Sequence, residues 1–421
     1  MSRFLLSKAA RGATALAFVL VAQLVAAQAI TNEVKDRVLN RMSELITQNA
    51  YVAGQDFGKW DSFLSAHKEA IDKAETVPTF ISSVNQALRQ FGFSHIQLMS
   101  PRTAEARRTR SMVGIGVSIQ IEPEGLRVVA LFDDGPAKKS GIEVGDIIME
   151  VDGHKAEDNS RIAGEEGTPV ELKIKRASGE VKTIKVVRAK FSTVRPETLT
   201  WVGDDTAVLK VPSFDTNYGA KNIEKLFSEA KRAKFLVIDL RANGGGAVIN
   251  MTHFLNHLLP VGTPVGTFVS RNVANRYKEE TKNEPDDVIA IAKWSPFKIR
   301  AGMANVERYK GRIAVLIDGG TGSASEITAA ALKENLNVPV VGSKSAGAVL
   351  ASLMAPLPDG FMLQYPVTDY VTNGGLRLEG NGVLPDVDAP APRFGEKDEA
   401  IEKALVLLQR AALRDQRSGG R

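Results

Sequence analysis

IAVLIDGGTGSASEITAAAL, residues 313–332, joins an apolar run to a helical segment through a glycine-rich turn. The apolar run predicts a buried strand that ends at Asp318, and Ser323 stands where the helix begins. Such a turn exposes a hydroxyl at the end of a sheet, beside helix N–H groups that have no intrahelical partner. Those groups can stabilise the oxyanion that forms when a hydroxyl attacks a carbonyl. Helix capping by the serine is the alternative interpretation.

A second junction of the same kind occurs in FLVIDLRANGGGAVINMTHFL, residues 235–255. Gly244, Gly245 and Gly246 follow the predicted strand and precede a predicted helix, so backbone amides there can approach a ligand closely. A phosphate loop is excluded, because the segment has neither a Lys-Ser/Thr ending nor GxGxxG spacing. Two such junctions at one edge of a sheet predict a binding crevice.

The surrounding pattern predicts an α/β core over residues 194–421. Short apolar runs at 207–211, 235–240, 313–318 and 339–342 read as strands, with helical stretches between three of them. Residues 396–413 form an amphipathic pattern that predicts a C-terminal helix. Residues 271–308 are a polar insertion without clear periodicity, and the sequence assigns it no role.

Two further regions precede this core. Residues 30–105 have helical periodicity, and the polar, arginine-rich stretch 101–111 reads as a linker. Residues 110–190 contain short β-like runs separated by turn residues, which predict a small β-rich domain. The fold class is therefore a multidomain α/β protein with an N-terminal helical segment.

Residues 1–29 read as a secretory signal peptide, with cleavage after Ala27 or Ala29. Its apolar run is about 14 residues long, short of the roughly 20 that a membrane span needs, although a retained anchor is the alternative. We therefore expect a periplasmic or secreted protein without stable membrane insertion once the leader is removed. The chain has no cysteine, which excludes disulfides, thiol catalysis and thiolate metal sites.

The net charge of +5 gives no support to a nucleic-acid partner. Three of the 54 basic residues, and no acidic residue, lie in the leader, so the remainder has 51 bases against 49 acids. His253 and His257 are one helical turn apart, but Phe254 stands where a zinc HExxH motif has glutamate. We therefore predict no metal, and no cofactor is expected.

The motif set resembles the C-terminal processing (tail-specific) serine peptidases and their tricorn-core relatives. It comprises GIGV, GPAKKSGIEVGDIIMEVDG, DLRANGGG, GGTGSASEI, VVGSKSAGA and LEGNGVLPD, in the order of that family. The resemblance covers nearly all of the chain after the leader and implies a crotonase/ClpP-like core. It also implies that Ser323 is the nucleophile and that the amides of Ala324 and of Gly244 or Gly245 form the oxyanion hole.

The general base departs from the best-known branch of that family, in which a lysine follows the serine by 25 residues. Position 348 is alanine here, and Lys344 is the nearest lysine in the matching segment. The tricorn-like branch uses a histidine preceded by serine, together with a later glutamate, and this implies His95, Ser94 and Glu379. An imidazole can take the proton of Ser323 and return it to the leaving amine. Lys344 remains the alternative base.

The β-rich block resembles a PDZ domain, in which Gly114, Ile115, Gly116 and Val117 would form the carboxylate-binding loop. The stretch 154–167 is shorter than in typical relatives and leaves little room for a second helix, so a purely structural domain is the alternative.

The resemblance implies a serine endopeptidase that hydrolyses polypeptides, with sites near their C-termini as candidates. A non-catalytic protein that binds peptides or apolar ligands on the same fold is the competing hypothesis. The natural substrate and the oligomeric state, including a homo-oligomer, stay open.

Overall fold

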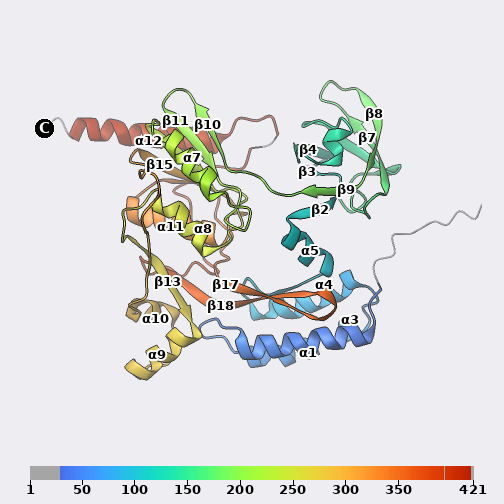
Figure 1. Cartoon of the computed structure of the whole chain (residues 1–421), viewed down its shortest axis with the longest axis horizontal. Helices are drawn as coiled ribbons and strands as arrows, with labels where there is room; N and C mark the ends of the chain where they lie inside the picture. The colour runs from blue at the N-terminus through green and yellow to red at the C-terminus, as the bar shows by residue number, and fades with distance from the viewer. Residues whose placement is uncertain (1–28, 393, 419–421) are drawn as a thin grey trace, which may run out of the picture.

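The structure is a computed structural model that describes residues 29–392 and 394–418. The predicted leader lies outside these residues except for Ala29. Figure 1 shows an α/β core, a separate β-rich domain and a layer of N-terminal helices beneath a long hairpin. The multidomain α/β architecture predicted from the sequence is confirmed. Over the described residues, no helix has both the length and the apolarity to cross a membrane.

The central sheet has the strand order β10-β11-β12-β15-β16-β19. Its members are β10 (Thr198–Val202), β11 (Thr206–Lys210), β12 (Phe235–Asp239), β15 (Arg312–Ile317), β16 (Val340–Gly342) and β19 (Val387–Asp388). All neighbouring pairs are parallel except β10 with β11. The carboxyl ends of β12 and β15 are therefore adjacent, and both glycine-rich turns leave the sheet at the same edge.

Helices cover both faces of this sheet, which explains why its strands read as continuous apolar runs. Leu236 and Ile238 face one core together with α7 (Ala220–Ala230), α8 (Val248–Asn256) and α11 (Ala324–Leu336). Phe235 and Val237 face the opposite core, which is closed by α12 (Glu399–Ser418).

A second sheet joins the N-terminal region to the core. Its strand order is β1-β18-β13-β14, and β17 pairs with β18 as well. The strands are β1 (Gln97–Met99), β13 (Pro264–Ser270), β14 (Ile299–Arg300), β17 (Ala351–Pro356) and β18 (Met362–Thr372). Because β1 pairs with β18, the segment that follows the N-terminal helices is fixed next to the core.

The N-terminal helices pack against the hairpin formed by β17 and β18 (Figure 1). They are α1 (Asn32–Asn49), η1 (Phe57–Lys59), α2 (Trp60–Ala66), α3 (Lys68–Asp72), α4 (Val77–Leu88) and η2 (Arg89–Phe91). Trp60 and Phe80 are fully buried in a shared cluster that includes Leu363 of β18. The N-terminal segment and the hairpin therefore share one hydrophobic core.

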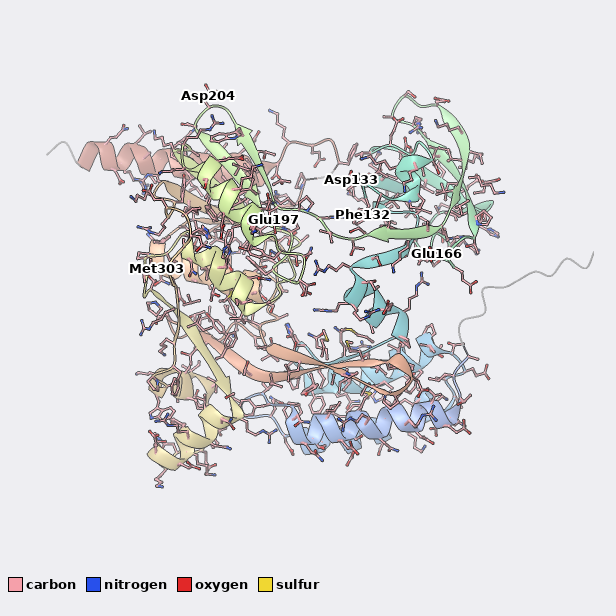
Figure 2. The ribbon with its side chains drawn as sticks, in the orientation of Figure 1. Phe132, Asp133, Glu166, Glu197, Asp204 and Met303 are labelled. Carbon is pink, nitrogen blue, oxygen red and sulfur yellow. The ribbon has the colours of Figure 1, made fainter. Side chains whose placement is uncertain are left out.

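The β-rich domain has its own hydrophobic core and the strand order β3-β4-β5-β7-β8, with β6 beside β5. The strands of this sheet are β3 (Val117–Glu122), β4 (Gly125–Leu131), β5 (Ile147–Val151), β6 (His154–Lys155), β7 (Pro169–Lys175) and β8 (Val181–Val187). A separate two-stranded sheet pairs β2 (Ser111–Gly114) with β9 (Ala189–Ser192). The short helix α6 (Pro136–Lys139) follows β4. Figure 2 shows Phe132 and Asp133 on the side of this domain that faces the core. Arg195 of the connecting segment lies over the Phe132 ring at 4.9 Å.

The stretch 101–111, predicted to be a linker without periodicity, is mostly helical. Helix α5 (Pro101–Thr109) has almost no apolar face, so periodicity gave no signal for it. Its ends are nevertheless specified locally. The Ser100 hydroxyl accepts a hydrogen bond from Thr103 N, Pro101 occupies the first turn, and Arg110 ends the helix in the left-handed region.

The insertion 271–308 also contains regular structure, namely α9 (Arg271–Thr281), α10 (Val288–Trp294) and β14. The Asp287 carboxylate caps α10 by accepting from Ile289 N and Ala290 N. Apolar residues of this insertion, such as Ile291, pack on Val269 of β13. The remaining short helix η3 (Pro358–Gly360) connects β17 to β18.

Candidate active site

Ser323 lies at the N-terminus of α11, at the end of the turn that follows β15. Its backbone has φ 53° and ψ −121°, an unusual conformation for a residue with a side chain. Its N–H donates to Ala348 O at 2.9 Å and to the Glu326 carboxylate at 3.0 Å. These contacts hold the turn in a conformation that an isolated serine would seldom adopt.

Glu326 is fully buried and accepts four hydrogen bonds. Besides Ser323 N, the donors are Ser345 Oγ at 2.5 Å, Gly347 N at 2.8 Å and Ala348 N at 3.0 Å. Burial raises the pKa of this carboxyl, while the four donors act in the opposite direction. The carboxyl thus fixes the start of α11 to the segment that follows β16.

The glycine turn after β12 lies against the Ser323 turn. A Cβ on Gly245 would be 2.7 Å from the Ser323 Cβ, so only glycine fits there. The N–H of Gly245 donates to the Asn243 side-chain oxygen at 2.9 Å, whereas a Cβ on Gly244 would meet no atom within 4 Å. Of the two glycines, Gly244 is therefore the one that lies open to a ligand.

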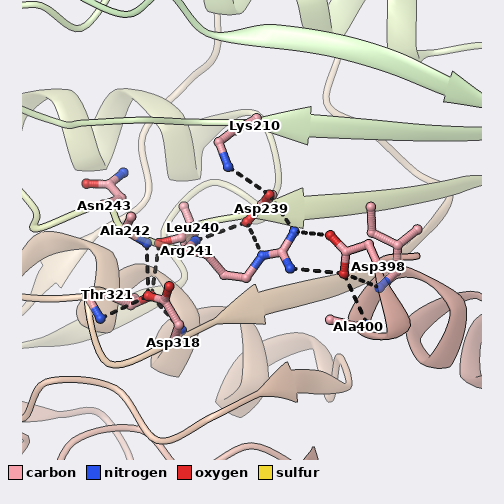
Figure 3. A network of polar contacts seen from close by, with 12 residues as sticks. Lys210, Asp239, Leu240, Arg241, Ala242, Asn243, Asp318, Thr321, Asp398 and Ala400 are labelled. Carbon is pink, nitrogen blue, oxygen red and sulfur yellow. Dashed lines mark hydrogen bonds and ion pairs between the residues drawn. The ribbon is translucent and has the colours of Figure 1, made fainter. Parts of the chain in front are cut away.

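An ion-pair network between the end of β12 and the start of α12 anchors this glycine turn (Figure 3). Arg241 pairs with Asp239 at 2.9 Å and with Asp398, just before α12, at 2.6 Å. Burial opposes ionisation of Asp239, but the hydrogen bonds and charge of Arg241 outweigh it and lower the pKa of that carboxyl. Asp318 at the end of the neighbouring strand β15 accepts from Ala242 N at 2.9 Å, so both glycine-rich turns are held together.

His95, Ser94 and Glu379 form a continuous hydrogen-bonded chain. Ser94 Oγ lies 2.6 Å from His95 Nδ1 and donates to Glu379 Oε2 at 2.9 Å. The Glu379 carboxylate also accepts from Ser94 N at 2.7 Å and from Val349 N at 2.7 Å. Three chain segments thus converge. Ser94 and His95 follow the N-terminal helices, Val349 follows β16, and Glu379 follows β18.

His95 also has an unusual backbone, with φ 59°. Burial of the ring, with a smaller effect from the Arg107 charge, lowers the pKa of His95 to about 4. The imidazole is therefore neutral at pH 7 and able to accept a proton.

Ser323 and His95 line the same cavity, which has a volume of about 480 Å³. Gly244, Gly245 and Ala324 also line it, as do Arg107 of α5 and Asp215 of the loop after β11. The structure therefore brings together the predicted nucleophile, base and backbone donors. Ser94 and Glu379 stand behind His95 in the hydrogen-bonded chain and do not line the cavity.

Lys344, the alternative base, does not line this cavity and is exposed.

The histidine pair at the C-terminal end of α8 packs among aromatic side chains. His253 lies against Tyr218, whose hydroxyl is 2.7 Å from its Nδ1, and His257 stacks on Phe227. Among the residues that the structure describes, no cluster of three or more His, Cys, Asp or Glu could hold a metal ion.

The predicted carboxylate-binding loop connects β2 to β3. Gly116 has φ 76°, and a Cβ there would lie 2.7 Å from the Cα of Gly135. Ile115 is buried, and its carbonyl accepts from Ala137 N at 2.7 Å. The loop formed by Gly114, Ile115, Gly116 and Val117 is thus fixed against the start of α6.

Residues 156–168 of the same domain form neither helix nor strand. The buried Arg188 guanidinium holds this shortened stretch by donating to the carbonyls of Arg161, Ile162 and Pro169. Backbone acceptors around one arginine thus take the place of a second helix.

Two supporting residues were not identified from the sequence. Glu326 follows Ser323 by three residues, the spacing of a capping box, and that signal could have found it. Asn243 is fully buried and fixes the glycine turn, because its side chain accepts from Gly245 N and donates to Val211 O. No local sequence pattern predicts these contacts.

Comparison with known proteins gives two domain matches. Residues 205–389 match peptidase family S41, and residues 113–187 match the PDZ domain. A probable CtpA-like serine protease of Staphylococcus epidermidis is 26% identical over 319 residues, covering 70% of this chain and 60% of the relative. A tail-specific protease of Haemophilus influenzae is 29% identical over 341 residues, covering 72% of this chain and 45% of the relative.

This chain therefore spans less than two thirds of the length of either relative. Among solved structures, a putative S41 protease from Bacteroides fragilis is similar, with a TM-score of 0.54 at 16% identity. That alignment covers 88% of this chain and 97% of the other, and it supports the shared fold. Residues 113–187 thus match a PDZ domain and residues 205–389 match peptidase family S41, in the order that the motifs predicted.

Proposed function

We propose that this protein is a serine endopeptidase in which Ser323 is the nucleophile and His95 the general base. The observation that carries the proposal is the hydrogen-bonded chain from Glu379 through Ser94 to His95, whose imidazole lines the same cavity as Ser323. A nucleophile, a base and a group that orients the base are the components of acyl-transfer catalysis.

The hydrogen bonds of Ser94 support one tautomer of His95, with the proton on Nδ1. Since Ser94 donates its hydroxyl proton to Glu379, its oxygen accepts the proton on His95 Nδ1. Nε2 then carries the free lone pair and can take the proton of Ser323. The neutral ring, whose pKa is lowered to about 4, is in the protonation state that this role needs at pH 7.

Attack of Ser323 Oγ on the scissile carbonyl forms a tetrahedral oxyanion. The amides of Ala324, at the start of α11, and of the open Gly244 are the donors that would stabilise it. The protonated His95 then donates to the leaving amine, which leaves an acyl-enzyme on Ser323. Water activated by the same imidazole releases the acyl group and restores the serine.

The proposed substrates are exported polypeptides, cut near their C-termini. Two observations support this choice: the names of the relatives, which include a tail-specific protease, and the PDZ domain at residues 113–187. A PDZ domain binds peptide C-termini by strand addition. The signal peptide predicted at residues 1–29 would place the enzyme in the periplasm or outside the cell.

The test is digestion of casein by the purified chain, with Ser323→Ala, His95→Ala and Lys344→Ala measured beside it. We expect cleavage by the wild type and by Lys344→Ala, and a loss of about 10⁴-fold or more for the other two variants. Loss of activity in Lys344→Ala with retention in His95→Ala would overturn the assignment of the base. A wild type as inert as Ser323→Ala on casein and on C-terminally varied peptides would favour the binding-protein hypothesis.

A further inference from the structure

The wall of the candidate active site carries two formal charges among the described residues that line it. They are Arg107, from α5, and Asp215, from the loop between β11 and α7. Asp215 follows Phe214, whose N–H donates to Gly245 O at 2.8 Å, so its side chain belongs to the wall beside the glycine turn. The other lining residues are apolar or uncharged at neutral pH, including His95.

These two side chains are paired with each other. Arg107 Nη2 lies 3.0 Å from Asp215 Oδ2, and the side chains are 48% and 37% exposed. An ion pair with this exposure contributes little to the free energy of folding. Both charged groups are accessible to a ligand in the cavity.

The carboxylate is held in place by its own loop. Asp215 Oδ1 accepts from Thr216 N at 2.8 Å, and Asp215 N donates to Ser213 Oγ at 2.9 Å. Arg107, in contrast, has five N–H donors and uses one of them for Asp215. The guanidinium therefore retains donors that would become available to a substrate carboxylate if Asp215 no longer neutralised its charge.

We propose that the Arg107–Asp215 ion pair determines the charge selectivity of the substrate cleft. Each charge cancels the field of the other, so the cleft favours peptide segments with uncharged side chains near the scissile bond. A charged side chain would lose part of its hydration there without gaining a net opposite charge. The inference rests on the proposed peptidase function, since it names the substrate class that this same site accepts.

The pair makes two opposite expectations. Asp215→Asn keeps the shape of the side chain and leaves the charge of Arg107 uncompensated, so acidic peptides should bind more tightly than to the wild type. Arg107→Gln leaves the charge of Asp215 uncompensated, so basic peptides should bind more tightly. The double variant should lose both preferences, because neither charge remains.

The experiment measures binding and cleavage of three labelled decapeptides that alternate alanine with glutamate, glutamine or lysine. Binding is measured in the Ser323→Ala background at pH 8, where His95 is neutral and turnover is absent. Each single variant should change the ratio of glutamate-peptide to lysine-peptide affinity by about tenfold, in opposite directions, and 0.5 M salt should reduce the change.

A matched control is the pair Arg37–Asp359, which lies outside the cavity and has side chains 51% and 34% exposed. Asp359→Asn and Arg37→Gln should leave the ratio unchanged. Equal ratios in Asp215→Asn, Arg107→Gln and the wild type, or no binding of any peptide, would overturn the inference. Because binding does not need turnover, a chain that binds with this selectivity but cleaves nothing would contradict only the proposed peptidase function.

Discussion

Two buried carboxylates accept hydrogen bonds from the segment after β16, and they differ in their other contacts. Glu326 accepts four hydrogen bonds, three from backbone amides including Ser323 N, and it fixes the nucleophile turn. Glu379 accepts from Val349 N in the same segment, but also from the Ser94 hydroxyl that contacts His95.

The two carboxylates therefore have different roles, since Glu326 fixes the position of the nucleophile turn and Glu379 the orientation of the base. Glu326 acts on backbone, so its removal should disturb the shape of the site and the stability of the fold. Glu379 acts through a hydroxyl on a titratable ring, so breaking that link should disturb proton transfer more than folding. The two halves of the site can therefore be impaired independently.

Of the variants that leave Ser323 and His95 in place, Ser94→Ala should have the largest effect, because it removes the hydroxyl between Glu379 and His95. Ser94 N still donates to Glu379, so the backbone link is kept. We expect kcat to fall on the order of 100-fold, because the base loses its orienting partner. The control is Ser228→Ala, at an exposed position on α7, which should leave kcat unchanged. The melting temperature of Ser94→Ala should stay near that of the wild type, because the effect is on the base and not on folding. Unchanged kcat would show that the chain does not orient the base.

Glu326→Gln should reveal the opposite behaviour. The amide places donors against a cluster of backbone N–H groups, which leaves buried groups unpaired and costs about 2 kcal/mol of unfolding free energy. Denaturant unfolding would measure this loss. Glu334→Gln, on the exposed face of the same helix, should be nearly neutral, although Glu334 accepts from Gly374 N. Equal stabilities of the two variants would refute the positional role.

The pH dependence of kcat/KM should sharpen the assignment of His95. Its neutral form is active, and its pKa is lowered to about 4 by burial and then by Arg107. Activity should therefore persist through pH 6 and fall as the pH drops through about 4. Arg107→Gln removes the second cause, so the acid limb should move to higher pH. An acid limb that stays in place, measured on an uncharged peptide, would contradict this coupling.

The smallest effect is expected for Lys344→Ala. This side chain is exposed and lies outside the cavity, so kcat/KM should change by less than about twofold. A larger loss, measured with the same peptide, would bring the lysine back as a candidate base.

The two glycine-rich junctions could be predicted because each is a continuous stretch of sequence in which strand, turn and helix follow one another. The chain from Glu379 to His95 could not be derived from local patterns. It joins residues 285 positions apart, and only the resemblance to a known family pointed to it.

Other features escaped prediction for a different physical reason. Helix α5 is specified by its ends and not by an apolar face, so its Arg107 was placed in a linker. The partner of Arg107 comes from a loop more than 100 residues later in the sequence. The charged wall of the cavity thus depends on tertiary contacts that no single stretch of sequence contains.

The central claim is tested most directly by the rate at which a fluorophosphonate labels Ser323 as a function of pH. The reagent needs no knowledge of the substrate. The account predicts labelling that is constant at neutral pH, falls through a pKa well below 6.5, is lost in His95→Ala and persists in Lys344→Ala. Labelling that rises with alkaline pH and disappears in Lys344→Ala would contradict it.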